Sequence, residues 1–266
     1  MGEKGIDYIE RNNIGIIILN RPDVLNAVDL ETAQHLREAV IAAERDSAVR
    51  CVLLMGAGKH FSAGGDVRFF HGTLELPLER RQTVFDEILR VLNDVIPRLR
   101  FMPKPVVASA RGAVAGLGVS IVAACDIALA AHDAMFSMAY CTIGGVPDSG
   151  ASVAIARLAN RKRAAELLML GGRFDAREAL DLGLIGRVVD AARLDDETQA
   201  LCASLAKGPT WALGCAKQLI NHADVTPLEA QLAEERIAFV DCVATDDFAE
   251  GLNAFVSHRP AVFRGG

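Results

Sequence analysis

Residues Gly112–Asp126 read GAVAGLGVSIVAACD, a glycine-rich turn followed by an apolar run. Three glycines in seven residues, Gly112, Gly116 and Gly118, remove side chains where a ligand can approach the backbone. The run predicts a buried helix over 117–124, whose first amide N–H groups lack intrahelical partners and form the positive end of its dipole. Such a terminus favours an anion, or an oxygen that becomes one during a reaction.

Short apolar runs on both sides of this stretch predict β-strands at residues 14–19, 51–55, 105–109 and 126–130. Tyr8–Glu10 precedes the first run, and Asn12-Asn13 between them predicts a hairpin at the edge of a sheet. Helices between the later strands are typical of parallel crossover units, in which ligands bind beyond the carboxyl ends of the strands. The loops after the second and third runs are therefore expected to converge.

Two helices are expected between these strands. Asp29 is the predicted cap of the first helix. The second carries an apolar stripe over 84–95 and is expected to stop near Pro97, because proline disrupts a helix interior. Residues 72–82, before this stripe, are polar and charged and show no clear pattern.

The later part of the chain is mainly helical. Asn160 and Asp175 are predicted helix caps, and a long helical tail is expected over 227–255. The one boundary in the pattern is a shift to helix near residue 200. We therefore divide the chain into a core over residues 1–200 and a helical C-terminal region over residues 201–266.

The composition is that of a soluble globular protein. The chain has 266 residues, 51% of them hydrophobic, which allows a large core. Its net charge of −6 leaves no basic excess to neutralise phosphates, so no nucleic-acid partner is expected. The longest apolar run covers residues 112–125, shorter than the ~20 residues of a membrane span, so no membrane segment is expected.

Cysteine usage and the N-terminus indicate an intracellular protein. The six cysteines include no CxxC pair, which is typical of reduced thiols in a core. The N-terminal segment MGEKGIDYIERNN carries charges where a signal peptide needs an apolar run. A cytoplasmic location is therefore expected.

Five motifs, in order and at the expected spacing, resemble the crotonase or enoyl-CoA hydratase/isomerase superfamily. They are LNRPDVLNA (19–27), FSAGGDV (61–67), GAVAGLGVSIVAACDIALA (112–130), IGGVPDSGAS (143–152) and RAAELLMLGGRFDAREALDLGLIGRVV (163–189). The resemblance implies an α/β fold, a crotonase-like spiral of strand-strand-helix turns with a helical C-terminal region. It further implies an acyl-CoA thioester substrate, no cofactor apart from the coenzyme A of that substrate, no metal, and a homotrimer or a dimer of trimers.

The resemblance also implies an oxyanion hole made by the backbone N–H groups of Ala63 and Leu117. A thioester oxygen gains negative charge when the neighbouring carbon loses a proton, and two amides would stabilise that enolate. Loss of one such donor typically costs roughly 2.7–4 kcal/mol. By the same resemblance, the residues expected to contact coenzyme A are Arg21, Leu25, Ala27, Asp66, Gly116, Phe255 and His258.

The sequence departs from the hydratase pattern at two positions. Hydratases of the family use two glutamates, and at the matching positions this chain has Ser120 and Tyr140. Serine is not ionised at neutral pH, and tyrosine, with a reference pKa near ~10, is a poor base. Efficient hydration of a 2-enoyl-CoA is therefore not expected.

Asp148 matches the catalytic acid of isomerase-type members, such as dienoyl-CoA and ring-oxepin-CoA isomerases, and of aryl-CoA dehalogenases. One carboxylate is enough to move a proton from C2 to C4 of a 3-enoyl thioester. The side chain would alternatively cap the next helix. Dehalogenation is a minor option, because residues 84–97 contain no histidine.

We therefore expect an enoyl-CoA isomerase in which Asp148 is the proton shuttle. A 2-enoyl-CoA hydratase is the alternative within the family, and a catalytically silent CoA-binding or scaffold protein is the alternative outside it. His60 and His71 flank the oxyanion loop and are further acid or base candidates. A second acid could come from Glu75, Glu79, Asp86 or Glu87 in the variable segment, residues 69–87. Residues 69–85 are expected to shape the pocket for the acyl group, but their pattern does not identify that group.

Overall fold

The computed structural model describes residues 5–223 and 225–266, so residues 1–4 of the charged N-terminal segment lie outside the described residues. Strands β1 (Ile6–Arg11) and β2 (Ile14–Leu19) pair antiparallel at one edge of a sheet. Asn12 and Asn13 between them have φ angles of 56° and 63°. Positive φ at both positions is what a two-residue hairpin of type I′ requires, so the predicted edge hairpin is confirmed.

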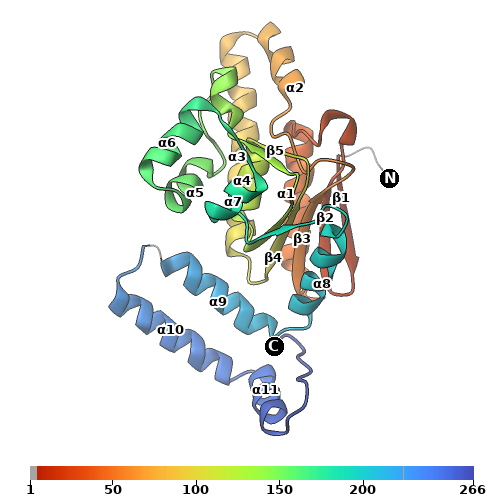
Figure 1. The fold of residues 1–266 in the computed structure, drawn as a ribbon, viewed down its shortest axis with the longest axis vertical. Helices are drawn as coiled ribbons and strands as arrows, with labels where there is room; N and C mark the ends of the chain where they lie inside the picture. The colour runs from red at the N-terminus through yellow and green to blue at the C-terminus, as the bar shows by residue number, and fades with distance from the viewer. Residues whose placement is uncertain (1–4, 224) are drawn as a thin grey trace.

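The main sheet continues with parallel strands β3 (Cys51–Gly56), β4 (Val106–Ala110), β6 (Ile127–Ala131) and β9 (Arg187–Val189). Alternate residues of these strands face opposite sides. One face packs against α1 (Leu30–Arg45) and α3 (Leu78–Phe101), and the other against α8 (Leu194–Ala206) (Figure 1). Burial on both faces explains why β3, β4 and β6 read as continuous apolar runs.

A second, smaller sheet contains β5 (Ala113–Ala115), β7 (Met135–Ser137) and β8 (Arg173–Asp175). Isolated bridges extend it by pairing Ser62 with Val114 and Val28 with Gly65. Successive turns of the chain thus contribute one segment to each sheet before a helix, as in β4, β5 and α4 (Leu117–Ala124). This is the strand-strand-helix spiral that the family resemblance implies.

Shorter helices complete the core. They are η1 (Pro22–Val24), α2 (Val67–Gly72), η2 (Thr73–Glu75), η3 (Ala139–Ile143), α5 (Ala151–Leu158), α6 (Arg161–Leu170) and α7 (Ala176–Asp181). The predicted caps are confirmed: the side chains of Asp29, Asn160 and Asp175 each accept backbone N–H groups at the start of a helix.

In the middle of the chain, one segment without a clear sequence pattern is structured and one expectation is wrong. Residues 72–82 are structured, since they hold the end of α2, all of η2 and the start of α3. Helix α3 does not stop near Pro97 but continues to Phe101. Pro97 lies in the last turns of α3, where its missing N–H removes one backbone hydrogen bond. The following residue, Arg98, pairs with Glu44 of α1 and with Asp94, which stabilises this turn.

The C-terminal helices α9 (Thr210–Ala223), α10 (Leu228–Val243) and α11 (Asp246–Val256) extend from one end of the core (Figure 1). The expected continuous tail is two helices, because Thr245 caps α11 with its hydroxyl. Lys217 of α9 attaches this region to the core. Its ammonium donates to the carbonyl of Leu99 at 2.8 Å and pairs with Asp126 at 2.8 Å.

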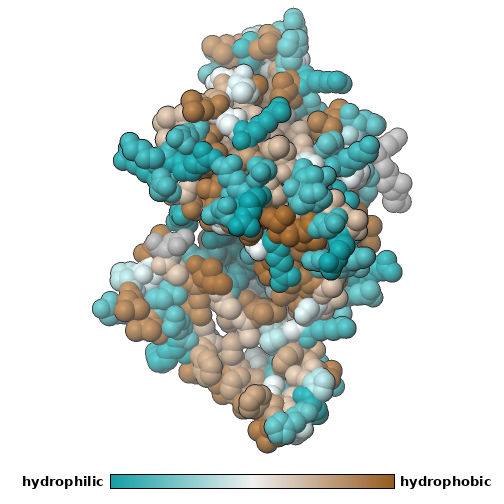
Figure 2. Space-filling model, viewed as in Figure 1, coloured by the Kyte–Doolittle hydropathy of each residue, from teal (hydrophilic) through white to brown (hydrophobic). Residues whose placement is uncertain are grey.

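Many apolar side chains of these helices are exposed, and Figure 2 shows them gathered over the end of the molecule that they form. Helix α10 buries none of its described residues. Throughout the described part of the chain, no helix has both the length and the apolar character needed to cross a membrane.

Candidate active site

The loops after β3 and β4 meet at the carboxyl ends of these strands, as the sequence predicts, and the loop over 20–29, the first of the three along the chain, joins them. Asn26 joins two of them, because its side-chain amide donates to the carbonyls of Ala57 and His60 at 3.0 and 2.8 Å. Ser62 joins the second loop to the third. It donates its N–H to the Ala113 carbonyl at 3.1 Å and accepts the Ala115 N–H at 2.8 Å.

Glycines allow this close approach. A Cβ on Gly64 would lie 2.7 Å from the Ala115 oxygen and 3.2 Å from the Leu117 nitrogen. A Cβ on Gly118 would lie 2.8 Å from the Ser62 oxygen. The φ angle of Gly64 is +91°, a region that side chains with a Cβ rarely adopt. The loop that carries Ala63 is therefore packed directly on the turn that carries Leu117.

The two predicted amide donors differ in the structure. Leu117 begins α4, and no acceptor for its N–H is found among the described residues. The Ala63 N–H donates to the Leu25 carbonyl at 2.9 Å. Leu25 itself has a left-handed φ of 57°. The sequence predicts two open donors, whereas the structure leaves one open and one paired with a loop carbonyl.

Both amide-bearing residues line one cavity of about 310 Å³. Apolar side chains form most of its wall, including Phe70 and Phe85, whose ring centroids are 4.8 Å apart. Tyr140 and Asp148 also line it, and Asp148 is the one charged side chain among the described lining residues. The structure thus brings together Ala63, Leu117, Tyr140 and Asp148.

The Asp148 side chain does not cap a helix. Gly150 precedes α5, and no side chain among the described residues caps that helix; Asp148 contributes only its backbone carbonyl, to the Ala151 N–H. Its carboxylate contacts Tyr140 instead, with Oδ1 at 3.5 Å from the phenol oxygen. Burial raises the pKa of Asp148, and the nearby hydroxyls of Ser149 and Tyr140 oppose that rise. A carboxylate of raised pKa is suited to accept and return a proton.

Ser120 lies behind Tyr140, at 3.4 Å between the two hydroxyl oxygens. Its hydroxyl also contacts the Asp148 carbonyl at 3.3 Å. Burial raises the pKa of Tyr140, and the negative charge of Asp148 adds to the effect, so the phenol stays protonated. Neither side chain is a base, which agrees with the departure from the hydratase pattern.

Arg21 and Asp66 have structural partners near the cavity. The Arg21 guanidinium pairs with Asp29 at 3.1 Å and with Asp66 at 3.0 Å, and donates to the Ala27 carbonyl at 2.8 Å. Asp66 also caps α2. These contacts fix the loop over 21–27 against the second loop. The sequence did not reveal this role, or that of Asn26, because both depend on contacts between distant segments.

Other candidates lie away from the cavity. Phe255 and His258 lie at the end of α11, and none of the described lining residues comes from the C-terminal helices. His60 accepts the Ala113 N–H at its Nδ1, a contact that joins two loops. His71 and the four acidic candidates of the variable segment are absent from the described lining: Glu75, Glu79, Asp86 and Glu87.

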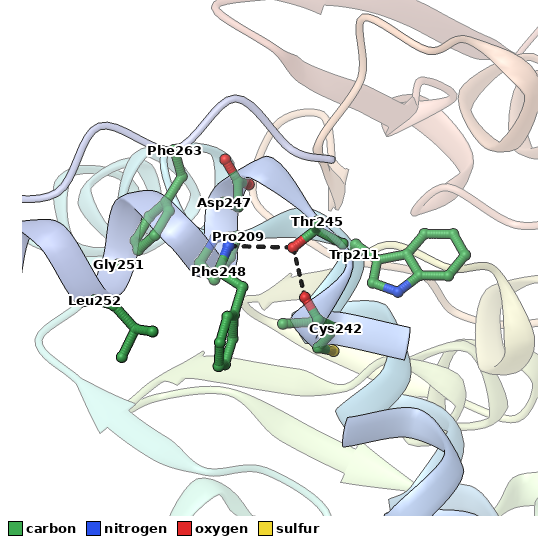
Figure 3. Close-up of a pocket in the computed structure, with 10 residues that line it drawn as sticks. Pro209, Trp211, Cys242, Thr245, Asp247, Phe248, Gly251, Leu252 and Phe263 are labelled. Atoms are coloured by element: carbon green, nitrogen blue, oxygen red, sulfur yellow. Dashed lines mark hydrogen bonds between the residues drawn. The ribbon is translucent and has the colours of Figure 1, made fainter. Parts of the chain in front are cut away.

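A second cavity, of about 230 Å³, lies among the C-terminal helices (Figure 3). Its polar groups are used in local structure. Thr245 donates to the Cys242 carbonyl at 2.8 Å and accepts the Phe248 N–H at 3.1 Å, as Figure 3 shows. The Asp247 carboxylate accepts the backbone N–H groups of residues 264 and 265. Most of this cavity's surface is apolar, and Asp247, the one carboxylate among its described lining residues, is already bound to two backbone N–H groups.

Comparison with known proteins adds independent information. A sequence model of the Enoyl-CoA hydratase/isomerase family matches residues 10–266. The chain is 35% identical to the 1,2-epoxyphenylacetyl-CoA isomerase of Escherichia coli (strain K12), over 98% of both chains. It is 29% identical to the short-chain-enoyl-CoA hydratase of Clostridium acetobutylicum, over 94% of both. A crystal structure of an enoyl-CoA hydratase from Polaromonas sp. JS666 superposes with a TM-score of 0.90 at 35% identity, covering 97% and 99% of the two chains. The structural similarity confirms the predicted fold. The names of the relatives include both an isomerase and a hydratase, so they do not distinguish between these two reactions.

Proposed function

Because the chain belongs to the enoyl-CoA hydratase/isomerase family, we propose that it is an enoyl-CoA isomerase that moves a double bond with one carboxylate, Asp148. One observation carries this proposal: Asp148 is the single charged side chain among the described residues of the cavity that Ala63 and Leu117 also line. Hydration requires groups that activate water and protonate carbon, whereas a double-bond shift requires one group that first accepts and then returns a proton.

The proposed reaction begins with a 3-enoyl thioester in the cavity. The Asp148 carboxylate takes a proton from C2, the C–H electron pair forms the C1–C2 double bond, and the carbonyl oxygen receives the displaced electrons. The Leu117 N–H stabilises that oxygen. Protonated Asp148 then returns the proton to C4, which leaves a double bond between C2 and C3 and restores the carbonyl.

Ala63 is proposed as the second oxyanion donor. Its N–H must then turn from the Leu25 carbonyl to the thioester oxygen, or be shared between them. The exchange would be favourable in the enolate, because a charged oxygen accepts a stronger hydrogen bond than a peptide carbonyl does. The Leu25 loop therefore adjusts during substrate binding in this proposal.

We also propose that coenzyme A lies along the loop over 21–27 and that the C-terminal region, residues 201–266, mediates assembly. Exposed apolar residues of α10, such as Phe239 and Val240, support an interface there. Phe255 and His258 would then reach the coenzyme A of a neighbouring copy. Light scattering should give three or six times the mass of one 28.4-kDa chain.

Two substrates distinguish the candidate reactions. Purified protein is incubated with a 3-enoyl-CoA and, separately, with the matching 2-enoyl-CoA, and the products are followed by ultraviolet absorbance and mass. Conjugation of the 3-enoyl substrate without gain of water supports the isomerase. Faster gain of water by the 2-enoyl substrate supports the hydratase, whose name several relatives carry. Binding of coenzyme A without either reaction supports a silent binding protein.

A further inference from the structure

Four oxygens from three residues, Ser120, Tyr140 and Asp148, form a cluster at the wall of the cavity. The Tyr140 hydroxyl lies 3.5 Å from Asp148 Oδ1 and 3.4 Å from Ser120 Oγ, and Ser120 Oγ lies 3.3 Å from the Asp148 carbonyl. Tyr140 and Ser120 are buried, with 8% and 2% of their surface exposed. Such contacts are often long before a ligand binds and tighten in the complex.

We propose that Tyr140 is a positioning residue for Asp148: its hydroxyl, oriented by Ser120, binds Oδ1 and leaves Oδ2 to exchange the proton with the substrate. This inference rests on the proposed function for its catalytic meaning, but the contact itself can be measured without turnover.

The number of protons sets how the cluster is arranged. Two hydroxyl hydrogens serve three contacts, so one contact always lacks a hydrogen. When Asp148 is ionised, its carboxylate is the strongest acceptor, and the Tyr140 hydrogen goes to it. When Asp148 has taken a proton from the substrate, its neutral carboxyl group is a weaker hydrogen-bond acceptor, and the Tyr140 hydrogen can turn to Ser120. The cluster thus has one arrangement for each protonation state of the shuttle.

Few charges compete with this effect. The described residues that α2, α3, α4 and η3 contribute to the lining of the cavity are all uncharged. Asp148 itself lies in the loop before α5. On the side of Ser120 that faces away from this cavity, Arg100 of α3 and Arg157 of α5 line a separate cleft together with Ser120. The Ser149 hydroxyl, which lines that cleft, favours the ionised carboxylate of Asp148 against the cost of burial, and the Tyr140 hydroxyl does so from the cavity side.

The test measures Asp148 directly. Protein labelled with [γ-¹³C]aspartate is titrated by NMR, and the Asp148 resonance is assigned by its absence from Asp148→Asn. In Tyr140→Phe the titration midpoint of Asp148 should move to higher pH, because a hydrogen bond to the ionised form is lost. The chain has one other tyrosine, Tyr8 on β1, so Tyr8→Phe is the matched control and should leave the midpoint unchanged.

Kinetics supply a second readout. With a 3-enoyl-CoA, kcat of Tyr140→Phe should fall by about ten- to a hundredfold, the rate equivalent of one hydrogen bond to a charged group, while KM changes little. Ser120→Ala should shift the midpoint in the same direction by less. The double variant Ser120→Ala/Tyr140→Phe should match Tyr140→Phe alone, since Ser120 acts through Tyr140.

An unchanged or lower midpoint in Tyr140→Phe overturns the proposal, and so do additive effects in the double variant. If Tyr140→Phe does not fold, judged by its melting curve, Ser120→Ala alone must still raise the midpoint. A raised midpoint in a protein that does not isomerise 3-enoyl-CoA would retain the contact between Tyr140 and Asp148 and refute the isomerase instead.

Discussion

Replacing Gly64 by alanine should separate the two loops that carry the amide donors. The new Cβ would lie 2.7 Å from the Ala115 oxygen and 3.2 Å from the Leu117 nitrogen, and both are backbone atoms that cannot rotate away. The φ of +91° adds a conformational cost of roughly 1–3 kcal/mol. If the collision moves one amide out of line with the thioester oxygen, kcat should fall by about 10²–10³-fold.

The assay compares two variants in kcat with a 3-enoyl-CoA and in melting temperature. Gly183 is the control, since its φ is +78° but its added Cβ would meet only Leu158 Cδ2, at 3.6 Å. Both variants should lose stability, at about 2–4 °C per kcal/mol in a chain of this size. Only Gly64→Ala should lose the rate. Equal rates in the two variants would refute the claim that packing of the loops at Gly64 positions the amides.

Two predictions concern buried charges. Because burial raises the pKa of Asp148, the folded protein holds this proton more tightly than the unfolded chain does. The stability gained in this way is fully present below the unfolded pKa of ~3.9 and is lost as pH rises through the folded pKa. Asp148→Asn should therefore melt above the wild type at about pH 8, with a difference that closes toward about pH 4; a wild type that melts higher at about pH 8 would contradict the assignment. Lys217→Met leaves Asp126 without its ammonium partner and should lower the free energy of unfolding in urea by roughly 3–5 kcal/mol, whereas adding Asp126→Asn should restore part of the loss.

The fold could be predicted where the pattern is local. The hairpin at Asn12-Asn13, the cap at Asp29 and the buried helix over 117–124 each follow from adjacent residues. The prediction that the helix stops near Pro97 failed because proline disrupts a helix most strongly in its interior. Here Pro97 lies near the end of a long helix, where it removes only one hydrogen bond.

The site could be predicted in outline but not in its contacts. Topology places the loops after β3 and β4 at one edge, and the structure confirms that they converge. The bond between the Ala63 N–H and the Leu25 carbonyl depends on how a distant loop folds back, and no local pattern contains it. The contact of Tyr140 with Asp148 likewise depends on how the loop between η3 and α5 turns, so from the sequence alone Tyr140 is only a position that lacks a glutamate.

The most direct test of the proposed mechanism is a single-turnover measurement with Asp148→Asn. Enzyme in excess over a 3-enoyl-CoA is mixed rapidly, and conjugation is followed while binding of the thioester is measured separately. Loss of the one acid–base group should lower the isomerisation rate by about 10²–10⁴-fold with little change in affinity. A variant that isomerises within twofold of the wild type would contradict the account, since the proton would then move through another group.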